Sequence, residues 1–156
     1  MSGVANMDDL KAGLACLGLL GASAVFGCDL QIESPWIREA PPTSTALAAY
    51  ATLKNGGSHA LQIVAISAAA AGMAMLHETT VTGGMARMRA VESLRIPAGG
   101  VIVLAPGGKH LMLMDLKGLP RTGEQLTISF KDTADCVTSA DFVIRRVRSE
   151  PLEPNR

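Results

Sequence analysis

The sequence predicts an all-β protein in which two antiparallel sheets pack as a sandwich. Beyond residue 28, short apolar or alternating runs recur at nearly regular spacing, with clusters of Gly, Pro, Asn and Asp between them. No long helical period interrupts these runs. With 156 residues, of which 48% are hydrophobic and 18% charged, the chain has enough apolar material for one packed domain.

Nine runs are expected to form strands, in chain order residues 30–38, 45–53, 61–67, 73–79, 85–91, 100–104, 110–116, 125–131 and 137–146. Turn signals separate them, at Pro41-Pro42, Asn55-Gly56-Gly57, Gly83-Gly84, residues 97–100, Pro106-Gly107-Gly108 and Arg121-Thr122-Gly123. The Ala-rich stretch 60–76 would also suit a helix by composition. Its residues Ile63, Val64 and Ile66 favour a strand instead.

Residues 12–28 carry no charge and are rich in Ala, Gly and Leu, a length borderline for a ~30 Å hydrocarbon core. A secretory signal fits this segment, with an uncleaved anchor helix as the alternative. Val25-Phe26-Gly27-Cys28 resembles a bacterial lipoprotein box, although Phe26 departs from the pattern. If the resemblance to Gram-negative lipoproteins holds, it implies that Cys28 is lipidated and that Asp29 signals retention at the inner membrane; ordinary cleavage and no cleavage stay open. Each alternative places the following domain outside the cytoplasm.

The expected division is therefore a signal peptide or lipoprotein signal and anchor over 1–28, a β-sandwich domain over 29–148 and a flexible tail over 149–156. Several function classes are disfavoured. The 14 basic and 14 acidic residues are scattered, which leaves no nucleic-acid footprint. The three cysteines, at positions 16, 28 and 136, form no Cys-x-x-Cys pair and argue against a zinc site, a thioredoxin-like site and a disulfide scaffold. An enzyme is also disfavoured, because the sequence near the histidines contains no Ser-His-Asp, Cys-His or paired-carboxylate pattern.

Two histidines and two methionines form the pattern that carries chemistry. Ten residues separate His77 from Met88, twenty-one separate Met88 from His110, and Met112 follows one residue later. Imidazole nitrogens with neutral thioether sulfurs suit copper(I) better than zinc, magnesium or calcium. On a strand, His110 and Met112 share one face, with Met114 next in line. Because the histidines must be neutral to coordinate, binding should weaken below their usual pKa of ~6.5.

The other soft or titratable residues have a structural alternative. Met73, Met75 and Met85 are expected to be packing residues, since methionine commonly fills cores. Met75 would nevertheless share a strand face with His77, so Met75 and Met114 are candidate auxiliary ligands. Three further side chains receive no role in the site: His59 is expected to be a solvated loop residue, Glu78 to point to the opposite strand face, and Cys136 to be a small buried hydrophobe.

With these residues in view, the chain resembles the periplasmic copper chaperone family PCuAC, whose pattern is His-x10-Met-x21-His-x-Met. The flanking stretches are also similar, at residues 76–79, 85–89, 96–100 and 106–114, as are Trp36 and Pro41-Pro42. The resemblance covers residues 30–147. It implies a cupredoxin-like Greek-key β-sandwich that binds one copper(I) through His77, Met88, His110 and Met112.

The resemblance also implies a function: delivery of copper(I) to the copper sites of respiratory oxidases, with oxidase assembly proteins or an oxidase subunit as recipient. The expected location is the periplasm, with a Cys28 lipid anchor in the inner membrane as one alternative. Two other functions stay open: a periplasmic copper scavenging or resistance protein that holds several ions, and a copper-independent β-sandwich binding module. Copper stoichiometry would separate the first of these from a chaperone.

Overall fold

The computed structural model describes residues 28–147, and every regular element in that range is a β-strand. The strands are β1 Leu30–Arg38, β2 Ala46–Asn55, β3 Leu61–Ala68, β4 Ala71–Thr82, β5 Met85–Val91, β6 Leu94–Ile96, β7 Val101–Leu104, β8 Lys109–Leu116, β9 Gln125–Asp132 and β10 Val137–Arg145. The predicted all-β fold is confirmed. Between residues 28 and 147 there is no helix long and apolar enough to cross a bilayer.

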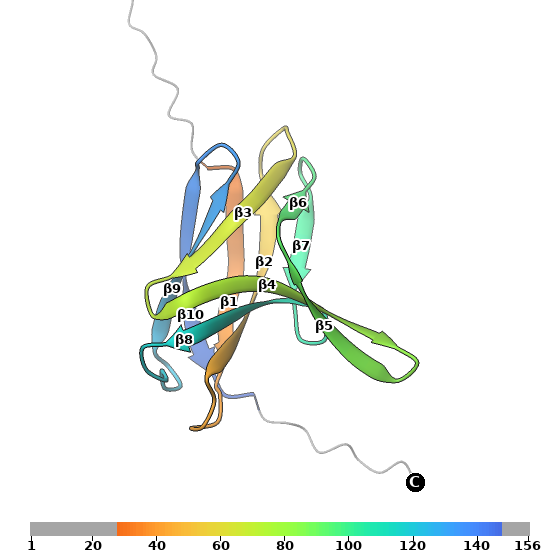
Figure 1. Cartoon of the computed structure of the whole chain (residues 1–156). Coiled ribbons are helices and arrows are strands. Elements are labelled where there is room, and N and C mark those ends of the chain that lie inside the picture. Colours follow the sequence, from red (N-terminus) through yellow and green to blue (C-terminus); the bar gives the residue numbers. More distant parts are fainter. Residues whose placement is uncertain (1–27, 148–156) are drawn as a thin grey trace, which may run out of the picture.

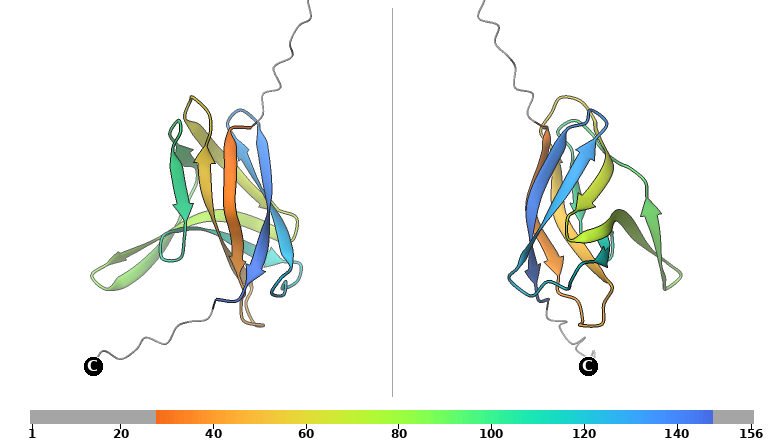
Figure 2. Two further views of the ribbon diagram at one scale, coloured as in Figure 1. Left: turned by 180° about the vertical axis from the view of Figure 1, so that it is seen from behind. Right: turned by 60° about the vertical axis from the view of Figure 1, so that its left-hand side comes forward.

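The strands form one hydrogen-bonded path in the order β5-β4-β8-β2-β1-β10-β9-β3-β6, with β7 paired to β2 beside this path. The path folds over on itself, so that β4 and β8 cross in front of the upright strands β1, β2 and β10 (Figure 1). The two views of Figure 2 show the same two layers from other sides. This arrangement is the expected β-sandwich.

The core between the layers consists of leucine, isoleucine, alanine and aromatic side chains. Its largest fully buried members are Phe130, Phe142, Ile37, Leu47, Leu53, Ile96, Leu111, Leu113, Ile128 and Ile144. None of the six methionines in the described range is buried. The expectation that Met73 and Met85 are packing residues is therefore wrong, since they are 47% and 63% exposed. Met75 is half-buried and lies outside the group of side chains that pack against the core.

Two features of the sheet differ from the sequence-based expectation. The strand β6 was not expected, because a three-residue strand with only Leu94 and Ile96 buried is too short to give a recognisable alternation. The pairing of β1 with β10 is parallel, whereas an antiparallel sandwich was expected. These strands lie at opposite ends of the domain sequence, so no tight hairpin forces them to run in opposite directions. The Ala-rich stretch is extended and forms β3 and the start of β4.

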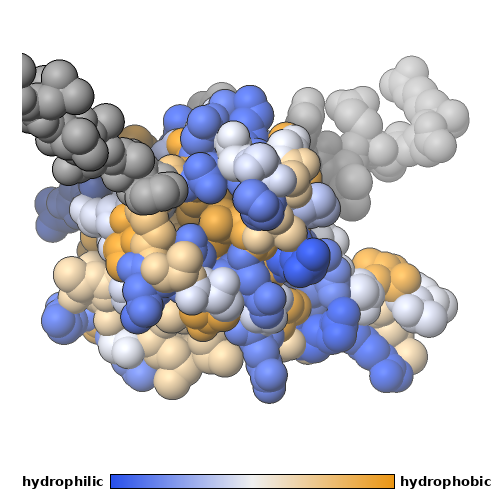
Figure 3. All heavy atoms as spheres, turned by 90° about the horizontal axis from the view of Figure 1, so that it is seen from above, coloured by the Kyte–Doolittle hydropathy of each residue, from blue (hydrophilic) through white to orange (hydrophobic). Residues whose placement is uncertain are grey.

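The hairpin of β4 and β5 projects from the body of the sandwich (Figure 1). Its two-residue turn is formed by Gly83 and Gly84, whose φ angles are 58° and 78°. Positive φ at both central residues is the requirement of a type I′ turn, whose twist matches that of the flanking strands. Near the turn, Val81 is 67% exposed. Figure 3 shows strongly hydrophobic residues on one side of the projecting lobe, next to residues of intermediate hydropathy at its end.

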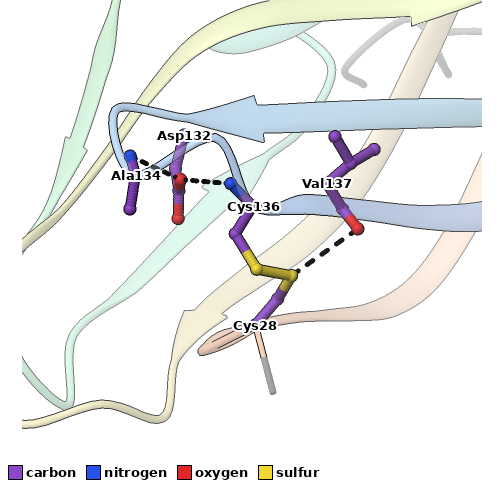
Figure 4. The surroundings of a disulfide bond; sticks show 5 residues. All are labelled: Cys28, Asp132, Ala134, Cys136 and Val137. Atoms are coloured by element: carbon purple, nitrogen blue, oxygen red, sulfur yellow. Dashed lines mark hydrogen bonds between the residues drawn. A yellow bond between two sulfur atoms is a disulfide. The ribbon is translucent and has the colours of Figure 1, made fainter. Parts of the chain in front are cut away.

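A disulfide bond joins Cys28, just before β1, to Cys136, just before β10 (Figure 4). The Asp132 carboxylate holds the turn before β10, since its Oδ1 atom accepts hydrogen bonds from the backbone amides of Ala134 and Cys136 at 2.8 and 2.9 Å. The expectations of no disulfide, and of Cys136 as an unpaired small hydrophobe, are therefore wrong. A separation of 108 residues gives no sequence signal for such a pair, because only the fold brings Cys28 and Cys136 together.

The disulfide also bears on the predicted lipid anchor. A sulfur atom bonded to Cys136 cannot at the same time carry a lipid thioether, so the structure does not show Cys28 as a lipidated residue. The rest of the lipoprotein-box pattern, at residues 25–27, lies outside the described residues, as do the remainder of the predicted signal or anchor segment and the predicted tail.

Candidate metal centre

The two candidate histidines face each other across the pairing of β4 and β8. His77 lies directly opposite His110 in the antiparallel register. Their ring centroids are 6.0 Å apart, and the ring planes meet at 89°. Directly opposite residues of an antiparallel pair project from the same side of the sheet. The structure therefore brings together two imidazoles that are far apart in the sequence.

The two candidate methionines lie on the same face as the histidines. Met112 follows His110 by two residues on β8 and so projects from the same side of that strand. Met88 lies opposite Thr79 in the pairing of β4 with β5, one diagonal step from His77. Diagonal neighbours in such a ladder are about 7–8 Å apart at Cα, which is within reach of long side chains. All four candidate ligands thus share one face over three adjacent strands.

His110 is 5% exposed and has a fixed orientation. Its Nδ1 lies 3.0 Å from the Gly108 carbonyl oxygen, to which an Nδ1–H group donates a hydrogen bond. The same carbonyl accepts a hydrogen bond from the Thr79 backbone amide at 3.1 Å, which ties the turn before β8 to β4. An imidazole that donates through Nδ1 keeps the lone pair of Nε2 free for a metal ion. The role of Gly108 as the hydrogen-bond acceptor of His110 is not evident from the sequence. The one available signal is the position of Gly108 in a turn, two residues before His110.

His77 carries the unsatisfied atom of the site. Its Nδ1 is buried and has no hydrogen-bond partner in the described part of the chain. Burial, together with the nearby His110 ring, lowers the pKa of His77 below its usual value. The imidazole therefore stays neutral to lower pH than an exposed histidine would. A neutral imidazole with an unpaired buried nitrogen has the chemistry expected of a metal ligand.

Aromatic rings line the site on the side of β2 and β1. The ring of Tyr50 lies 6.4 Å from that of His110, and the ring of Trp36 lies 4.5 Å from that of Tyr50. Trp36, Tyr50, His110 and His77 thereby form a row of rings across four strands, here called the ring row. Tyr50 is buried and was not predicted as part of the site, since nothing in its sequence surroundings distinguishes it from a core residue.

Two other side chains, Glu78 and His59, lie outside the site, as the sequence predicts. Glu78 binds Lys109 and Arg89 in ion pairs of 2.6 Å each, and both cations lower the pKa of its carboxyl group. Its engagement with these two cations agrees with the expectation that it plays no part beside His77. His59 is exposed in its loop, as expected, and its Nδ1 lies 3.0 Å from the Ser58 hydroxyl.

The donor set decides which ions fit this arrangement. Within residues 28–147, no group of three His, Cys, Asp or Glu side chains is placed to hold a metal ion. A metal ion between His77 and His110 would therefore depend on thioether sulfur for its remaining ligands. Two neutral nitrogens and two neutral sulfurs favour a soft monovalent ion such as copper(I), whose filled d shell imposes little geometry. The residues present thus fit copper(I).

Comparison with known proteins places this site in a family context. The chain is 36% identical over 103 residues to the "Putative lipoprotein Lxx21020" of Leifsonia xyli subsp. xyli; the match covers 65% of this chain and 61% of that protein, or less than two thirds of the relative's length. The solution structure of CuI-DR1885 from Deinococcus radiodurans is 32% identical, with 81% of this chain and 83% of that chain covered and a TM-score of 0.60.

A further structural neighbour is the copper-bound PCuAC domain from PmoF2. It covers 76% of this chain and 94% of its own, with a TM-score of 0.64 and 17% identity, so this likeness concerns the fold alone. Together the neighbours confirm the resemblance to PCuAC domains. The family model described as "Putative lipoprotein LpqE-like" matches residues 30–140. The β-sandwich that carries the His77 and His110 pair therefore belongs to the LpqE-like family.

Proposed function

We propose that this protein is a non-enzymatic, extracytoplasmic copper(I) chaperone that binds one ion tightly through His77, Met88, His110 and Met112. The observation that carries the proposal is the direct cross-strand pairing of His77 with His110, with both methionines on the same face. The copper(I) form of DR1885, a neighbour at 32% identity, supports copper as the ion. The binding unit we propose is residues 29–148, with 1–28 as a signal or anchor segment and 149–156 as a tail. Cys28, the last residue of the first segment, is tied to the binding unit by its disulfide with Cys136.

The exposure of the ligands supports a carrier that exchanges its ion. His110 lies at the inner end of the site, with 5% exposure, whereas Met88 is 55% exposed on the projecting hairpin. An incoming ligand from a recipient protein can replace an exposed thioether without unfolding the core. Neutral thioethers also hold copper(I) without a proton to lose, so release needs no change of pH.

The proposed location is extracytoplasmic, and the periplasm or the outer face of the inner membrane is the compartment we favour. The disulfide between Cys28 and Cys136 supports this location, since such bonds persist in oxidising compartments. The family description and the Leifsonia relative both carry the name lipoprotein, which supports an association with the membrane. The proposed recipient is a copper site of a respiratory oxidase or one of its assembly proteins.

Copper(I) titration tests the site. The purified protein competes for copper(I) with a chromophoric chelator. Ascorbate keeps the copper in the +1 state and leaves the disulfide intact. We expect one tightly bound ion in the native protein and a fall in affinity of at least about tenfold in His110→Ala and in Met88→Leu. Met85→Leu is the matched control, because Met85 lies on the same hairpin with 63% exposure and outside the proposed ligand set. Unchanged affinity in both site variants would reject the proposal.

A transfer experiment separates a chaperone from a scavenger. The copper(I)-loaded protein is mixed with a chelator of moderately higher affinity, and the metal-free and metal-bound fractions are followed with time. A chaperone with an exposed Met88 gives up its ion within seconds, and Met88→Leu changes the transfer rate. Retention of the ion for hours against the stronger chelator would favour storage or scavenging over delivery.

A further inference from the structure

The outer face of β4 and β8 continues beyond the histidines as two methionine pairs. Met75 lies opposite Met112, and Met73 lies opposite Met114, in the same unbroken register that pairs His77 with His110. Of three successive cross-strand pairs on this face, the first consists of two imidazoles and the next two consist of two thioethers each. From these pairs we infer a second site for a soft monovalent metal ion, formed by Met73, Met75 and Met114 and here called the thioether site.

The geometry brings three sulfurs within reach of one point. Directly opposite residues have Cβ atoms about 4.5–5.5 Å apart, and neighbouring rows on one face are about 7 Å apart along the strands. Methionine is unbranched and has three rotatable bonds, so its sulfur can swing toward a point between two rows. On β2, the residues paired with Met114 and Met112 are Ala46 and Ala48, whose small side chains leave room beside the methionines.

Burial argues against a packing role for these side chains. Met73 is 47% exposed, and Met75 and Met114 are half-buried. The core is complete without them, since the residues that fill it and those that pack against it include no methionine of this face. A row of partly exposed thioethers gains little from the hydrophobic effect. Their partial exposure does, however, let an ion in solution reach the thioether sulfurs.

The chemistry of the thioether site differs from that of the first site. It has no imidazole, so it lacks the stronger nitrogen donors and should hold its ion more weakly. Three neutral sulfurs select copper(I) or silver(I) over zinc, magnesium and calcium, which prefer nitrogen, thiolate or oxygen ligands. The site does not depend on the function proposed above, because none of its three ligands belongs to the first site.

Silver(I) is a suitable probe, since it is soft, monovalent and does not change oxidation state during the titration. The purified full chain is labelled with carbon-13 at the methionine methyl groups, and silver(I) is added in steps while the methyl resonances are followed by NMR. We expect the first equivalent to shift Met88 and Met112. We expect a second, weaker equivalent to shift Met73, Met75 and Met114 and to leave Met85 in place.

Variants assign the second ion to its ligands. Replacement of Met73, Met75 and Met114 together by leucine, which nearly preserves volume, should weaken the second equivalent by at least about tenfold and keep the first within about threefold. The single variant Met73→Leu alters only an exposed side chain and should show the same loss in smaller measure, so the test does not depend on the folding of the triple variant. Met85→Leu is the control and should keep both ions.

The outcomes separate this inference from the proposed function. Titration of the His110→Ala variant should lose the first equivalent and keep the second. The thioether site is rejected if the native protein binds a single ion, or if a second ion leaves the methyl resonances of all three methionines unchanged. It is also rejected if the triple variant retains the second ion at native affinity. Failure of the first equivalent alone would reject the proposed function and leave the thioether site standing.

Discussion

His77 and His110 place two titratable rings directly opposite each other on the adjacent strands β4 and β8. This placement opposes a charge on His77, first because the ring is partly buried and second because the His110 ring lies 6.0 Å away. The fold thereby favours the neutral form of His77, which is also the form that binds metal ions. The fold therefore disfavours protonation of His77, and metal binding requires the same unprotonated ring.

His77 should titrate below pH 6.5 in the metal-free protein, because burial and the neighbouring His110 both oppose its charged form. Above pH 6.5 the ring is neutral in the folded and the unfolded chain, and it contributes no pH dependence. As the pH falls below 6.5, the unfolded chain takes up its proton first, so stability decreases until the lower folded-state pKa is passed. NMR titration of the imidazole resonances measures this pKa.

The control for this experiment is His77→Gln, which should lose the corresponding part of the pH dependence of unfolding. A His77 pKa at or above 6.5 in the folded protein would contradict the assignment of a buried, neutral ring. The same measurement gives the pH below which His77 is protonated and can no longer bind a metal ion. A lowered pKa extends metal binding to lower pH than an exposed histidine allows.

The candidate ligands could be predicted from the sequence at this scale, because soft donors at fixed spacing carry chemical information. The way they are held could not. The hydrogen bond from His110 to the Gly108 carbonyl depends on the backbone path of one turn. The position of Tyr50 beside His110 depends on the register between β2 and β8. Register is a property of paired strands and leaves no mark in either strand alone.

Among the elements, the hairpin of β4 and β5 has the most direct link to the site, because it carries Met88 at the edge of the sheet. An edge strand is held by hydrogen bonds on one side only, so its position depends strongly on its turn. This turn requires the positive φ angles of Gly83 and Gly84.

Gly84→Ala should destabilise the hairpin by about 1–2 kcal/mol, because an L-residue at a φ of 78° is strained even where there is space for its side chain. Amide hydrogen exchange of β5 should accelerate, and copper(I) affinity should fall together with the position of Met88. Gly118→Ala is the matched control, since its added Cβ would meet no atom within 4 Å and its φ is not in the positive range. Equal exchange rates in the two variants would show that the turn does not hold Met88.

Most strands could be predicted to within a few residues, since alternation and turn residues are local signals. The strands 30–38 and 85–91 were predicted with the bounds that the structure has. The short β6 was missed, because three residues contain too little pattern. The exposure of Met73 on β4 could not be predicted either, because methionine is common both in cores and on exposed surfaces.

At the scale of the whole molecule, the disulfide joins the segments that lead into the first and the last strand of the sandwich. It connects Cys28 and Cys136 across 108 residues, and the strands that follow them, β1 and β10, pair in parallel. Closing so long a loop restricts the unfolded chain far more than the folded one. The sandwich layers could be predicted from the sequence, whereas this closure could not, because it depends on the pairing of β1 with β10, which brings Cys28 and Cys136 together.

Cys136→Ser should lower the free energy of unfolding by about 2–5 kcal/mol, because the unfolded chain regains the freedom that the bond removes. Chemical denaturation of the native protein and the variant measures the difference. Cys28→Ser should give the same loss, and a reductant should destabilise the native protein without affecting either variant. A native protein indifferent to reductant would show that the two cysteines are not bonded in solution.

The ring row has a consequence for how this molecule can be observed. Trp36 is the single tryptophan of the sequence, and its ring contacts that of Tyr50, which in turn lies beside His110. All tryptophan emission of the protein therefore originates a few ring contacts from the place where a metal ion would lie, and a bound copper ion should quench it. Loading and release then become visible as changes in ultraviolet fluorescence, in real time and without an attached dye.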